Sequence, residues 1–478
     1  MNTKNNILLG TYGSISDGYT EIDHKLYDAV SGEEIKENSP QVKSLITKED
    51  FELYRNCGFD VMSTGITPYY GTDYENSFVY KTLKLAEDKG LKVIVLDGRL
   101  LDLCNSEAPL VGSGRKFETR EKLDEYVESC IKEYRKSDAF FALNLRDEPK
   151  YTAFPAISEV YKSLNRIAPE IKVFINLLPL VENSVTASCY AEGGTSEDIE
   201  GAYLKYLDSF TQATGLDYIM LDSYPFCESA DGSCTRMNRH HLRCIKTVAD
   251  YCAKRKLKFY LIVQTFDMDA YDGKSKKLIK WYRKCKENDV YWQTNLAVAS
   301  GVRFLQYYTY FPHRGNCTES EMFGNEGCIV KRDGTPTPLY QSVKKINGEL
   351  KKIAPEILSY EYRKCGVKIS DELAYSEFFD KEYLDKVNAY DEEFDRISLT
   401  AEEGAIYVAE KYNPKNGAFA YMLINIADPS ANISAVARIK GKNCRLRLSE
   451  IIEAENELDG ETICVRLNPG RAAFVVAD

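Results

Sequence analysis

The stretch Ala139-Phe140-Phe141-Ala142-Leu143-Asn144-Leu145-Arg146-Asp147-Glu148-Pro149 decides the fold expected for this chain. It begins as an almost unbroken apolar run without helical periodicity, which predicts a strand buried on both faces. It ends in three charged residues and Pro149. A proline cannot donate to a β-ladder and restricts the residue before it, so we expect the strand to end here with Glu148 extended. An acid pair therefore stands at the carboxyl end of a buried strand.

Similar apolar runs alternate with helical patterns on both sides of this stretch. Thr47 stands three residues before Asp50, a spacing that resembles a helix capping box. Alternation of strands and helices implies parallel strands with crossover helices. Eight repeats, with no GxGxxG loop after the first strand, favour a (β/α)8 TIM barrel over an open doubly wound sheet. Besides the strand at 139–147, we predict strands at 7–12, 59–64, 91–96, 172–178, 217–222, 258–264 and 302–310, and helices at 47–56, 77–89, 118–136, 153–167, 196–213, 237–254, 274–299 and 339–353.

The pattern changes after Pro355. A charged segment is followed by short runs of alternating apolar and polar residues, which predict a small all-β sandwich. We therefore expect a barrel catalytic domain at 1–356, a charged connector at 357–402 and a C-terminal β-sandwich domain at 403–478, the last with a structural role.

Composition excludes some classes of function. Of 478 residues, 44% are hydrophobic and 28% charged, and the net charge of −11 comes with scattered Lys and Arg, which argues against a nucleic-acid surface. No apolar run reaches the roughly 18 residues of a membrane span. The N-terminus is too polar for a signal peptide, so we expect a cytoplasmic protein, or a secreted one whose signal peptide has been removed. The oligomeric state is left open.

The 14 cysteines include no CxxC pair, which argues against a zinc ribbon. The loop pairs Cys227 with Cys234 and Cys317 with Cys328 suit disulfides in an oxidising compartment, but free thiols are favoured without a signal peptide. No cofactor is implied and no metal site is expected. An oxygen-only site from Asp97, Asp147 and Asp222 stays open, and with it a metal-dependent hydrolase or lyase.

Acids, amides and aromatic residues stand at the predicted carboxyl ends of the strands, where a barrel carries its chemistry. This mixture suits a neutral polyhydroxylated ligand, and the lack of a Gly-rich loop or Lys cluster argues against phosphate. Each residue also has a structural reading: Asp222 paired with Arg146, Asp97 in a turn, and the amides and tyrosines as barrel core. The candidate substrate-binding residues are Tyr12, Asp97, Arg146, Asn176, Tyr224, Gln264, Tyr308, Tyr310 and His313.

Glycoside hydrolysis needs one carboxyl group to protonate the leaving oxygen and another to attack carbon or activate water. Glu148 is the expected general acid. The neighbouring charge of Asp147 and partial burial would raise its pKa, as an acid working near neutrality requires.

The Arg-Asp-Glu-Pro sequence at 146–149 resembles the strand-four tip of clan A glycoside hydrolases, which include the family 42 β-galactosidases. In those enzymes the Glu at this tip is the acid/base. The tracts 301–310 and 333–340 are similar to their last strand and final helix, and 221–226 resembles bacterial barrel proteins of the same broad group. The resemblance covers about residues 7–355 and implies a glycosidase acting on an oligo- or polysaccharide.

One position departs from that family. Its strand-seven Glu, the nucleophile, is replaced by Gln264, and a neutral amide cannot attack. Asp222 is the first candidate for the second carboxylate. The second is a substrate-assisted mechanism resembling that of N-acetylhexosaminidases, with Asp147 orienting a substrate acetamide and Glu148 as acid. A barrel that binds carbohydrate without cleaving it is the competing class. The third candidates are loop acids: Glu228, Glu319, Glu321 and Glu326.

Overall fold

The computed structural model confirms the expected fold class. Eight parallel strands belong to one sheet, in the order β7-β6-β5-β4-β1-β14-β11-β8. A single bridge between Leu177, after β7, and Leu221, in β8, joins the two edges of this sheet into a nearly closed barrel. The barrel strands are β1 (Leu8–Thr11), β4 (Val61–Ser63), β5 (Lys92–Val95), β6 (Phe140–Asp147), β7 (Lys172–Asn176), β8 (Tyr218–Asp222), β11 (Lys258–Gln264) and β14 (Val302–Tyr308). The structure describes residues 6–13, 15, 19–22, 25–28, 46–64, 74–233, 235–271, 278–312, 321–323, 326–370, 393–447, 454–459 and 462–477.

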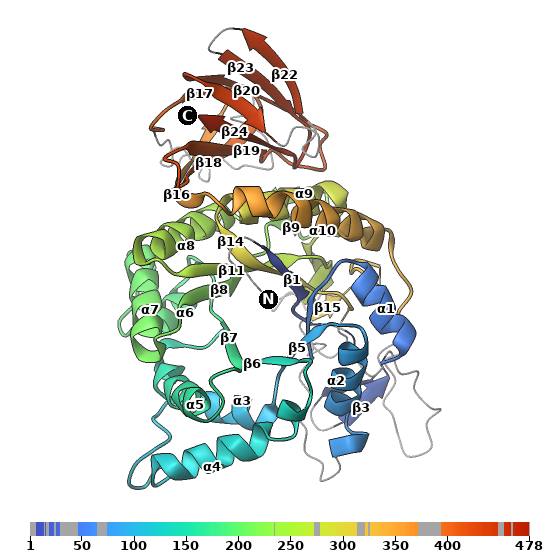
Figure 1. The fold of residues 1–478 in the computed structure, drawn as a ribbon, viewed down its shortest axis with the longest axis vertical. Coiled ribbons are helices and arrows are strands. Elements are labelled where there is room, and N and C mark those ends of the chain that lie inside the picture. The colour runs from blue at the N-terminus through green and yellow to red at the C-terminus, as the bar shows by residue number, and fades with distance from the viewer. Residues whose placement is uncertain are drawn as a thin grey trace. The chain divides into compact units, whose positions relative to one another are not determined.

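The helices follow the strands in the expected alternation. Thr47 caps the first of them, accepting a hydrogen bond from the Asp50 amide at 3.1 Å, as the capping-box spacing predicts. Figure 1 shows α3, α4 and α5 on the outer side of β5, β6 and β7. The helices are α1 (Lys48–Asn56), α2 (Phe78–Asp88), α3 (Gly98–Cys104), α4 (Arg120–Ile131), α5 (Phe154–Ile167), α6 (Ser184–Tyr190), α7 (Ile199–Thr214), α8 (His241–Arg255), α9 (Glu287–Ala299) and α10 (Pro338–Ile357), with 3₁₀ turns η1 (Tyr74–Asn76), η2 (Tyr134–Lys136) and η3 (Tyr151–Ala153).

The chain divides into two compact units. The first holds Leu9–Asp222 and Arg332–Gly334, and the second holds Met1–Leu8, Ser223–Lys331 and Thr335–Asp478. In the first unit, β6 pairs in parallel with β5 and β7, and the bridge from Leu177 continues to β8. The carboxyl ends of β6, β7 and β8 therefore meet within that unit, and this is where the candidate acids stand.

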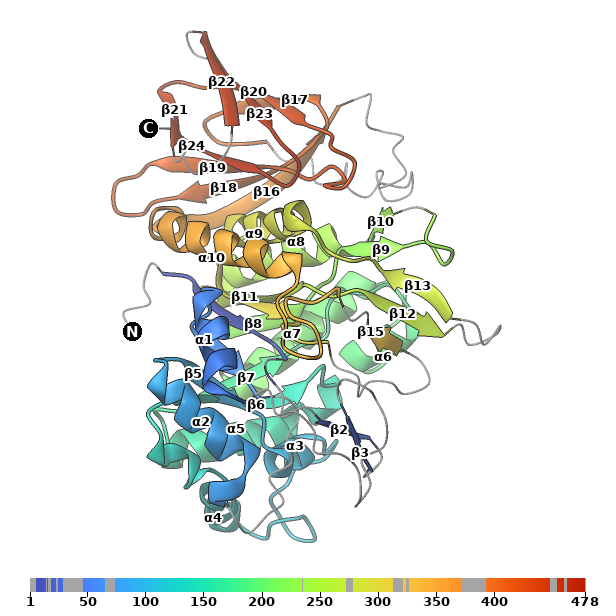
Figure 2. The ribbon, with the colours of Figure 1, turned by 90° about the vertical axis from the view of Figure 1, so that its right-hand side faces the viewer.

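The helix predicted at 274–299 is only partly correct. Leu278–Tyr282 forms strand β13, and α9 begins at Glu287. Ile279, Trp281 and Tyr282 are residue types that favour strands, and a sheet outside the barrel gives them partners. That sheet of the second unit, seen in Figure 2, has the order β10-β9-β13-β12-β15, with β9 (Phe226–Glu228), β10 (Thr235–Met237), β12 (Met268–Tyr271) and β15 (Glu321–Phe323). A two-stranded sheet joins β2 (Tyr19–Ile22) and β3 (Lys25–Asp28).

The C-terminal residues form the expected antiparallel sheets, in the orders β16-β18-β19-β24-β21 and β17-β20-β23-β22. Their inner faces pack into one apolar cluster that includes Val408, Leu423 and Val465. The domain boundaries expected at residues 356 and 402 stay predictions. The strands are β16 (Glu361–Ile369), β17 (Ser398–Glu403), β18 (Ala405–Tyr412), β19 (Phe419–Asn425), β20 (Ala435–Lys440), β21 (Cys444–Arg447), β22 (Ala454–Asp459), β23 (Thr462–Leu467) and β24 (Ala472–Ala477).

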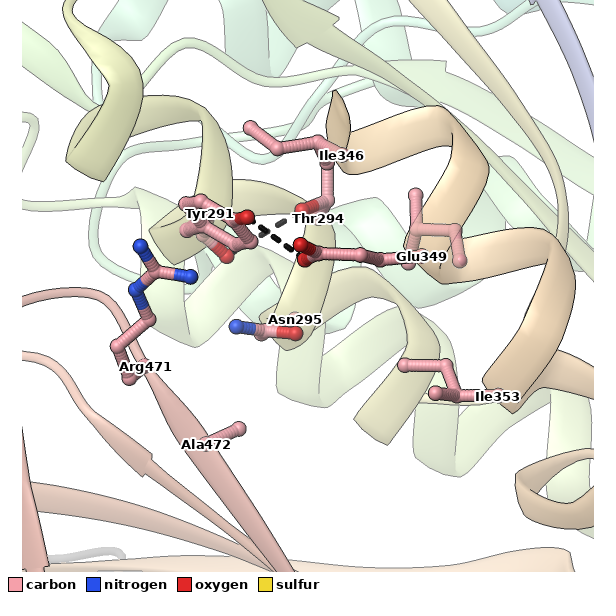
Figure 3. A pocket seen from close by; sticks show the side chains of 9 residues that line it. Tyr291, Thr294, Asn295, Ile346, Glu349, Ile353, Arg471 and Ala472 are labelled. Atoms are coloured by element: carbon pink, nitrogen blue, oxygen red, sulfur yellow. Dashed lines mark hydrogen bonds between the residues drawn. The ribbon is translucent and has the colours of Figure 1, made fainter. Parts of the chain in front are cut away.

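Within the second unit, the C-terminal sheets pack on α9 and α10. The Arg471 guanidinium lies over the Tyr291 ring at 3.5 Å from its centre, and the Tyr291 hydroxyl donates to Glu349 at 2.6 Å (Figure 3). Asn295 donates to the Gly470 carbonyl at 2.9 Å. Polar and cation–π contacts of this kind hold the sheets against the helices.

Two further expectations concern cysteines and membranes. Cys227 is a free thiol. Cys234 and Cys317, the partners considered for Cys227 and Cys328, lie outside the described residues, so neither pairing is tested. In the part of the chain that the structure describes, no helix combines the length and apolar character needed to cross a bilayer.

Candidate active site

Glu148, directly after β6, has an unusual backbone. Its φ of +42° lies in the left-handed region, which a non-glycine residue rarely adopts, so the expected extended conformation is wrong. Two neighbouring hydrogen bonds hold this backbone. The Glu148 amide donates to the Asn176 carbonyl at 2.8 Å, and the Tyr206 hydroxyl donates to the Pro149 carbonyl at 2.6 Å. Backbone outliers fixed by their surroundings concentrate at functional sites.

Asp147 is held by two donors from other strands. The Tyr12 hydroxyl and the Asn176 side-chain amide both donate to its Oδ1, each at 2.9 Å. Asn144 donates in turn to the Tyr12 oxygen at 2.9 Å. Burial, and then the Asp147 charge, raise the pKa of Tyr12 well above its usual value, so the phenol stays protonated and remains a donor.

Asn176 joins Asp147 to Asp222. Its amide nitrogen also donates to Asp222 Oδ1, at 2.7 Å, and Asp222 is only 8% exposed at the end of β8. Each amide proton of Asn176 is therefore used on a carboxylate. The amide therefore links carboxyl groups from the two strands that neighbour β7.

The Glu148 carboxyl hydrogen-bonds directly to Asp222. The pKa of Glu148 is raised far above its usual value. The first cause is burial of the carboxyl group among protein atoms, although other atoms of the residue are exposed, and the second is the charge of Asp222 and then of Asp147. The charge of Arg146 acts in the opposite direction. With Asn176 donating to both aspartates, the shared proton resides on Glu148. The site thus presents a carboxylic acid that stays protonated at neutral pH.

Three buried polar atoms around this cluster have no hydrogen-bond partner within the protein: Arg146 Nε, Asn144 Oδ1 and Asn176 Oδ1. Buried polar groups are normally satisfied, so each of these atoms is available to ordered water or to a ligand hydroxyl. They offer one donor and two acceptors beside the three carboxyl groups.

Asp97 is engaged in a structural role. It is 1% exposed, caps α3, and binds the Arg99 guanidinium at 2.6 Å and the Tyr134 hydroxyl at 2.7 Å. These contacts match its alternative reading as a turn residue. Its predicted substrate contact has no support in this geometry.

Gln264, in the second unit, is fully buried and bonded to backbone groups. Its side chain accepts from the Phe226 amide at 3.0 Å and donates to the carbonyls of Phe226 and Arg283 at 3.2 and 3.3 Å. Gln264 thus ties β11 to β9 and to the residue after β13. These bonds favour the core reading over substrate contact.

The predicted aromatic residues other than Tyr12 are Tyr224, Tyr308 and Tyr310, which lie in the second unit. Tyr224 and Tyr308 are half-buried, and their rings stack with centroids 5.9 Å apart. Tyr310 is 2% exposed, in line with barrel filling. His313 lies outside the described residues. Sugar contacts by these side chains stay predictions.

The four loop acids considered as third candidates for the second carboxylate have different surroundings. Glu326 pairs with Lys331 at 2.8 Å, and Glu228 lies in β9. The side chains of Glu319 and Glu321 lie outside the described residues. No group of three or more His, Cys, Asp or Glu side chains arranged to hold a metal ion occurs among the residues that were described.

Sequence reasoning missed two residues of the site. Asn144 is the one polar residue inside the apolar run that opens β6, and that interruption is a usable signal. Tyr206, on α7, reaches the backbone after Glu148, and nothing in its helical pattern sets it apart.

No family model matches the sequence, and no curated protein matches it significantly. Solved structures of similar fold include a candidate α-L-fucosidase of Bacteroides thetaiotaomicron, with 13% identity, a TM-score of 0.43, and coverage of 74% of this chain and 98% of the other. A Marinomonas β-galactosidase has 12% identity and a TM-score of 0.44, with 66% and 59% covered. A β-glucuronidase of an uncultured Clostridium has 13% identity and a TM-score of 0.41, and the match covers 72% of this chain and 50% of the other. The chain thus spans 59% and 50% of the length of these last two proteins. At such identities the likeness is one of fold.

Proposed function

We propose that this chain is a glycoside hydrolase in which Glu148 is the general acid. The observation that carries the proposal is the cluster of carboxyl groups at the carboxyl ends of β6 and β8, where Asn176 joins Asp147 to Asp222 and the surroundings raise the pKa of Glu148. Barrel enzymes carry their active sites at this end of the strands. Protonation of a glycosidic oxygen near neutrality requires a carboxylic acid whose pKa has been raised by its surroundings.

Asp222 is the proposed second carboxylate. Asn176 donates to its Oδ1, an arrangement that suits the carboxylate that a nucleophile or general base must be. Carboxyl groups in glycosidases stand about 5–5.5 Å apart for retention and about 6.5–9.5 Å for inversion. A direct carboxyl–carboxyl hydrogen bond is shorter, so an entering sugar has to separate the pair. Glu148 then turns to the glycosidic oxygen while Asn176 holds Asp222 in place.

Asp147 supports a second candidate mechanism. It is fixed by Tyr12 and Asn176, and it adjoins Glu148 in the chain. In a substrate-assisted reaction the acetamide oxygen of the sugar attacks, an aspartate orients the acetamide, and the glutamate donates the proton. That arrangement needs no second carboxylate across the sugar, which suits the close contact between Glu148 and Asp222.

The test is hydrolysis of a panel of α- and β-linked aryl glycosides, with galactose, glucose, fucose, glucuronic acid and N-acetylglucosamine, together with natural oligosaccharides. Glu148→Gln should lower kcat by roughly 10²–10⁴ on any cleaved substrate whose leaving group needs a proton. Glu170→Gln is the matched control, since Glu170 is exposed and paired with Arg135 at 2.9 Å. Sugar binding without turnover, unaffected by Glu148→Gln, would establish the non-catalytic class instead.

The same panel separates the two mechanisms. If Asp222 is the second carboxylate, Asp222→Asn abolishes cleavage of sugars with or without an acetamide. If the reaction is substrate-assisted, only acetamido sugars are cleaved, and Asp147→Asn has the larger effect.

A further inference from the structure

Trp281 is one of three exposed large apolar side chains among the described residues, with Val185 and Leu204, and it is the aromatic one of the three. It is 39% exposed, whereas the second tryptophan of the chain, Trp292, is fully buried. Trp281 lies on β13, in the sheet outside the barrel strands of the second unit (Figure 2). An exposed indole on a regular sheet needs a reason, because burying this side chain would stabilise the fold.

The backbone around Trp281 is irregular. In the β12–β13 ladder, Tyr282 pairs with Met268 and Lys280 pairs with Asp269, so Trp281 is the extra residue of a β-bulge. Successive side chains on a regular strand point to opposite faces, which would turn the indole away from Tyr282. Instead, the two rings stack with centroids 4.9 Å apart and planes 28° from parallel. The bulge thus aims the indole and fixes it against a neighbouring ring.

Tyr282 connects this indole to the ends of the barrel strands. Its ring packs on Phe266, two residues after β11, with centroids 5.2 Å apart, and on Tyr224, at 6.0 Å. Tyr224 stacks in turn on Tyr308, the last residue of β14. A continuous series of ring contacts therefore runs from the carboxyl ends of β11 and β14 outward to Trp281.

Polar groups flank the indole. Lys280 donates to Asp269 at 3.0 Å across the same ladder, and both side chains are near the surface. An exposed aromatic face beside hydrogen-bonding groups is the combination that a pyranose ring uses, with its C–H face on the ring and its hydroxyls on the polar groups.

We propose that Trp281 is a sugar-binding platform for an outlying residue of an oligosaccharide chain. This inference rests on the proposed function for its class of ligand and extends it, because a platform at the far end of the aromatic series has a use only for a substrate longer than one sugar. The proposed substrate is therefore an oligo- or polysaccharide, and an aryl monoglycoside would leave Trp281 unoccupied.

The presence of only two tryptophans makes a direct test possible. Iodide quenches the fluorescence of an exposed indole and does not reach a buried one, so the quenched component reports Trp281. The experiment uses the full chain carrying Glu148→Gln, to prevent turnover. The probes are glucose, xylose, mannose and galactose oligosaccharides of increasing length, with the free monosaccharides for comparison. Longer chains should protect the fluorescence from iodide, and monosaccharides should not.

Trp281→Ala in the same background should weaken the affinity for the protecting oligosaccharide by about tenfold or more, as measured by titration calorimetry. Trp281→Phe keeps an aromatic face and should restore part of that affinity. Absence of protection by every oligosaccharide, or an affinity unchanged in Trp281→Ala, would overturn the proposal.

This binding readout is independent of catalysis. Protection of Trp281 in a chain that cleaves no glycoside would refute the hydrolase and leave the platform intact. Cleavage of oligosaccharides with kcat/KM unaffected by Trp281→Ala would refute the platform alone.

Discussion

The pKa of Glu148 is raised only in the folded chain. Because it differs between the folded and unfolded chain, the free energy of unfolding depends on pH. Below the usual glutamate pKa of about 4.3, both folded and unfolded chains are protonated at this site. As the pH rises through that value, the unfolded chain gains from ionising Glu148 while the folded chain keeps the proton, so folding stability falls until the folded pKa is passed. The acid is thus held at some expense of stability, as is common at active sites.

We therefore predict that Glu148→Gln raises the thermal midpoint of unfolding at neutral pH, because glutamine donates to Asp222 without holding a titratable proton. The gain should vanish near pH 4. Parallel melting curves of the two proteins at both pH values check this. A midpoint difference that does not change with pH would contradict the raised pKa.

Asp222 supplies a second prediction at the residue scale. Its charge is the largest electrostatic contribution that raises the pKa of Glu148. A general acid acts only while protonated, so activity falls as pH rises through its pKa. On any substrate that Asp222→Asn still cleaves, the alkaline limb of the kcat/KM profile should shift to lower pH. A limb in the same place would show that another group controls it.

At the scale of elements, local sequence patterns predicted strands and helix ends well. The buried strand at 139–147 and the Thr47 cap follow from local patterns and are confirmed. Strand β13 was predicted as helix, because its strand character depends on partners in a sheet distant in sequence. The left-handed backbone of Glu148 was missed for the same reason. It is stabilised by groups from β7 and α7 that no local pattern reveals.

The end of α9 carries a prediction of its own. Lys411, from β18, is fully buried and donates to the carbonyls of Val298 and Ala299 at 3.3 and 3.0 Å. Burial lowers the pKa of Lys411 to about 7. The unfolded chain binds this proton up to a pH of about 10.4, so the contribution of Lys411 to stability should rise with pH between these values.

Lys411→Met should remove that dependence. The melting midpoint of the natural chain, relative to the variant, should rise as the pH is brought from 7 towards 10. Lys415→Met, at an exposed position in the turn after the same strand, serves as control and should give a constant difference. A constant difference for Lys411→Met as well would mean that the lysine stays charged when buried.

At the scale of the whole chain, the C-terminal sheets are packed with α9 and α10 in one compact unit. Gly470 tests this packing. It has φ +71°, and a Cβ there would meet the Asn288 carbonyl oxygen, in α9, at 2.4 Å. Gly417 has φ +78° with no atom within 4 Å of such a Cβ. Alanine at Gly417 should destabilise the chain by about 1–2 kcal/mol, the cost of left-handed backbone alone.

Gly470→Ala should destabilise the chain by clearly more than Gly417→Ala. The reason is that the turn before β24 and helix α9 must also move apart to make room for the Cβ. Chemical unfolding followed by tryptophan fluorescence measures both, with buried Trp292 on α9 as the reporter. Equal losses for the two variants would show that the close approach at Gly470 carries no energy.

The candidate site could be foreseen only in part. Position at strand ends was enough to select Glu148, Asp147, Asp222, Asn176 and Tyr12, which the structure joins by hydrogen bonds. The same rule also selected Asp97, which caps a helix, because sequence position does not tell which way a side chain turns. The left-handed backbone of Glu148 and its interaction with Asp222 were not foreseen, since both depend on groups far away in the sequence.

The measurement that tests the central claim most directly is the dependence of Glu148→Gln on the leaving group. A dinitrophenol leaves without a proton, whereas a sugar hydroxyl or simple phenol needs one, so a missing general acid affects only the poor leaving groups. We predict that Glu148→Gln keeps most of its kcat/KM on dinitrophenyl glycosides and loses roughly 10²–10⁴ on the matching phenyl glycosides. An equal loss on both, or none on either, would contradict the assignment of Glu148 as the acid.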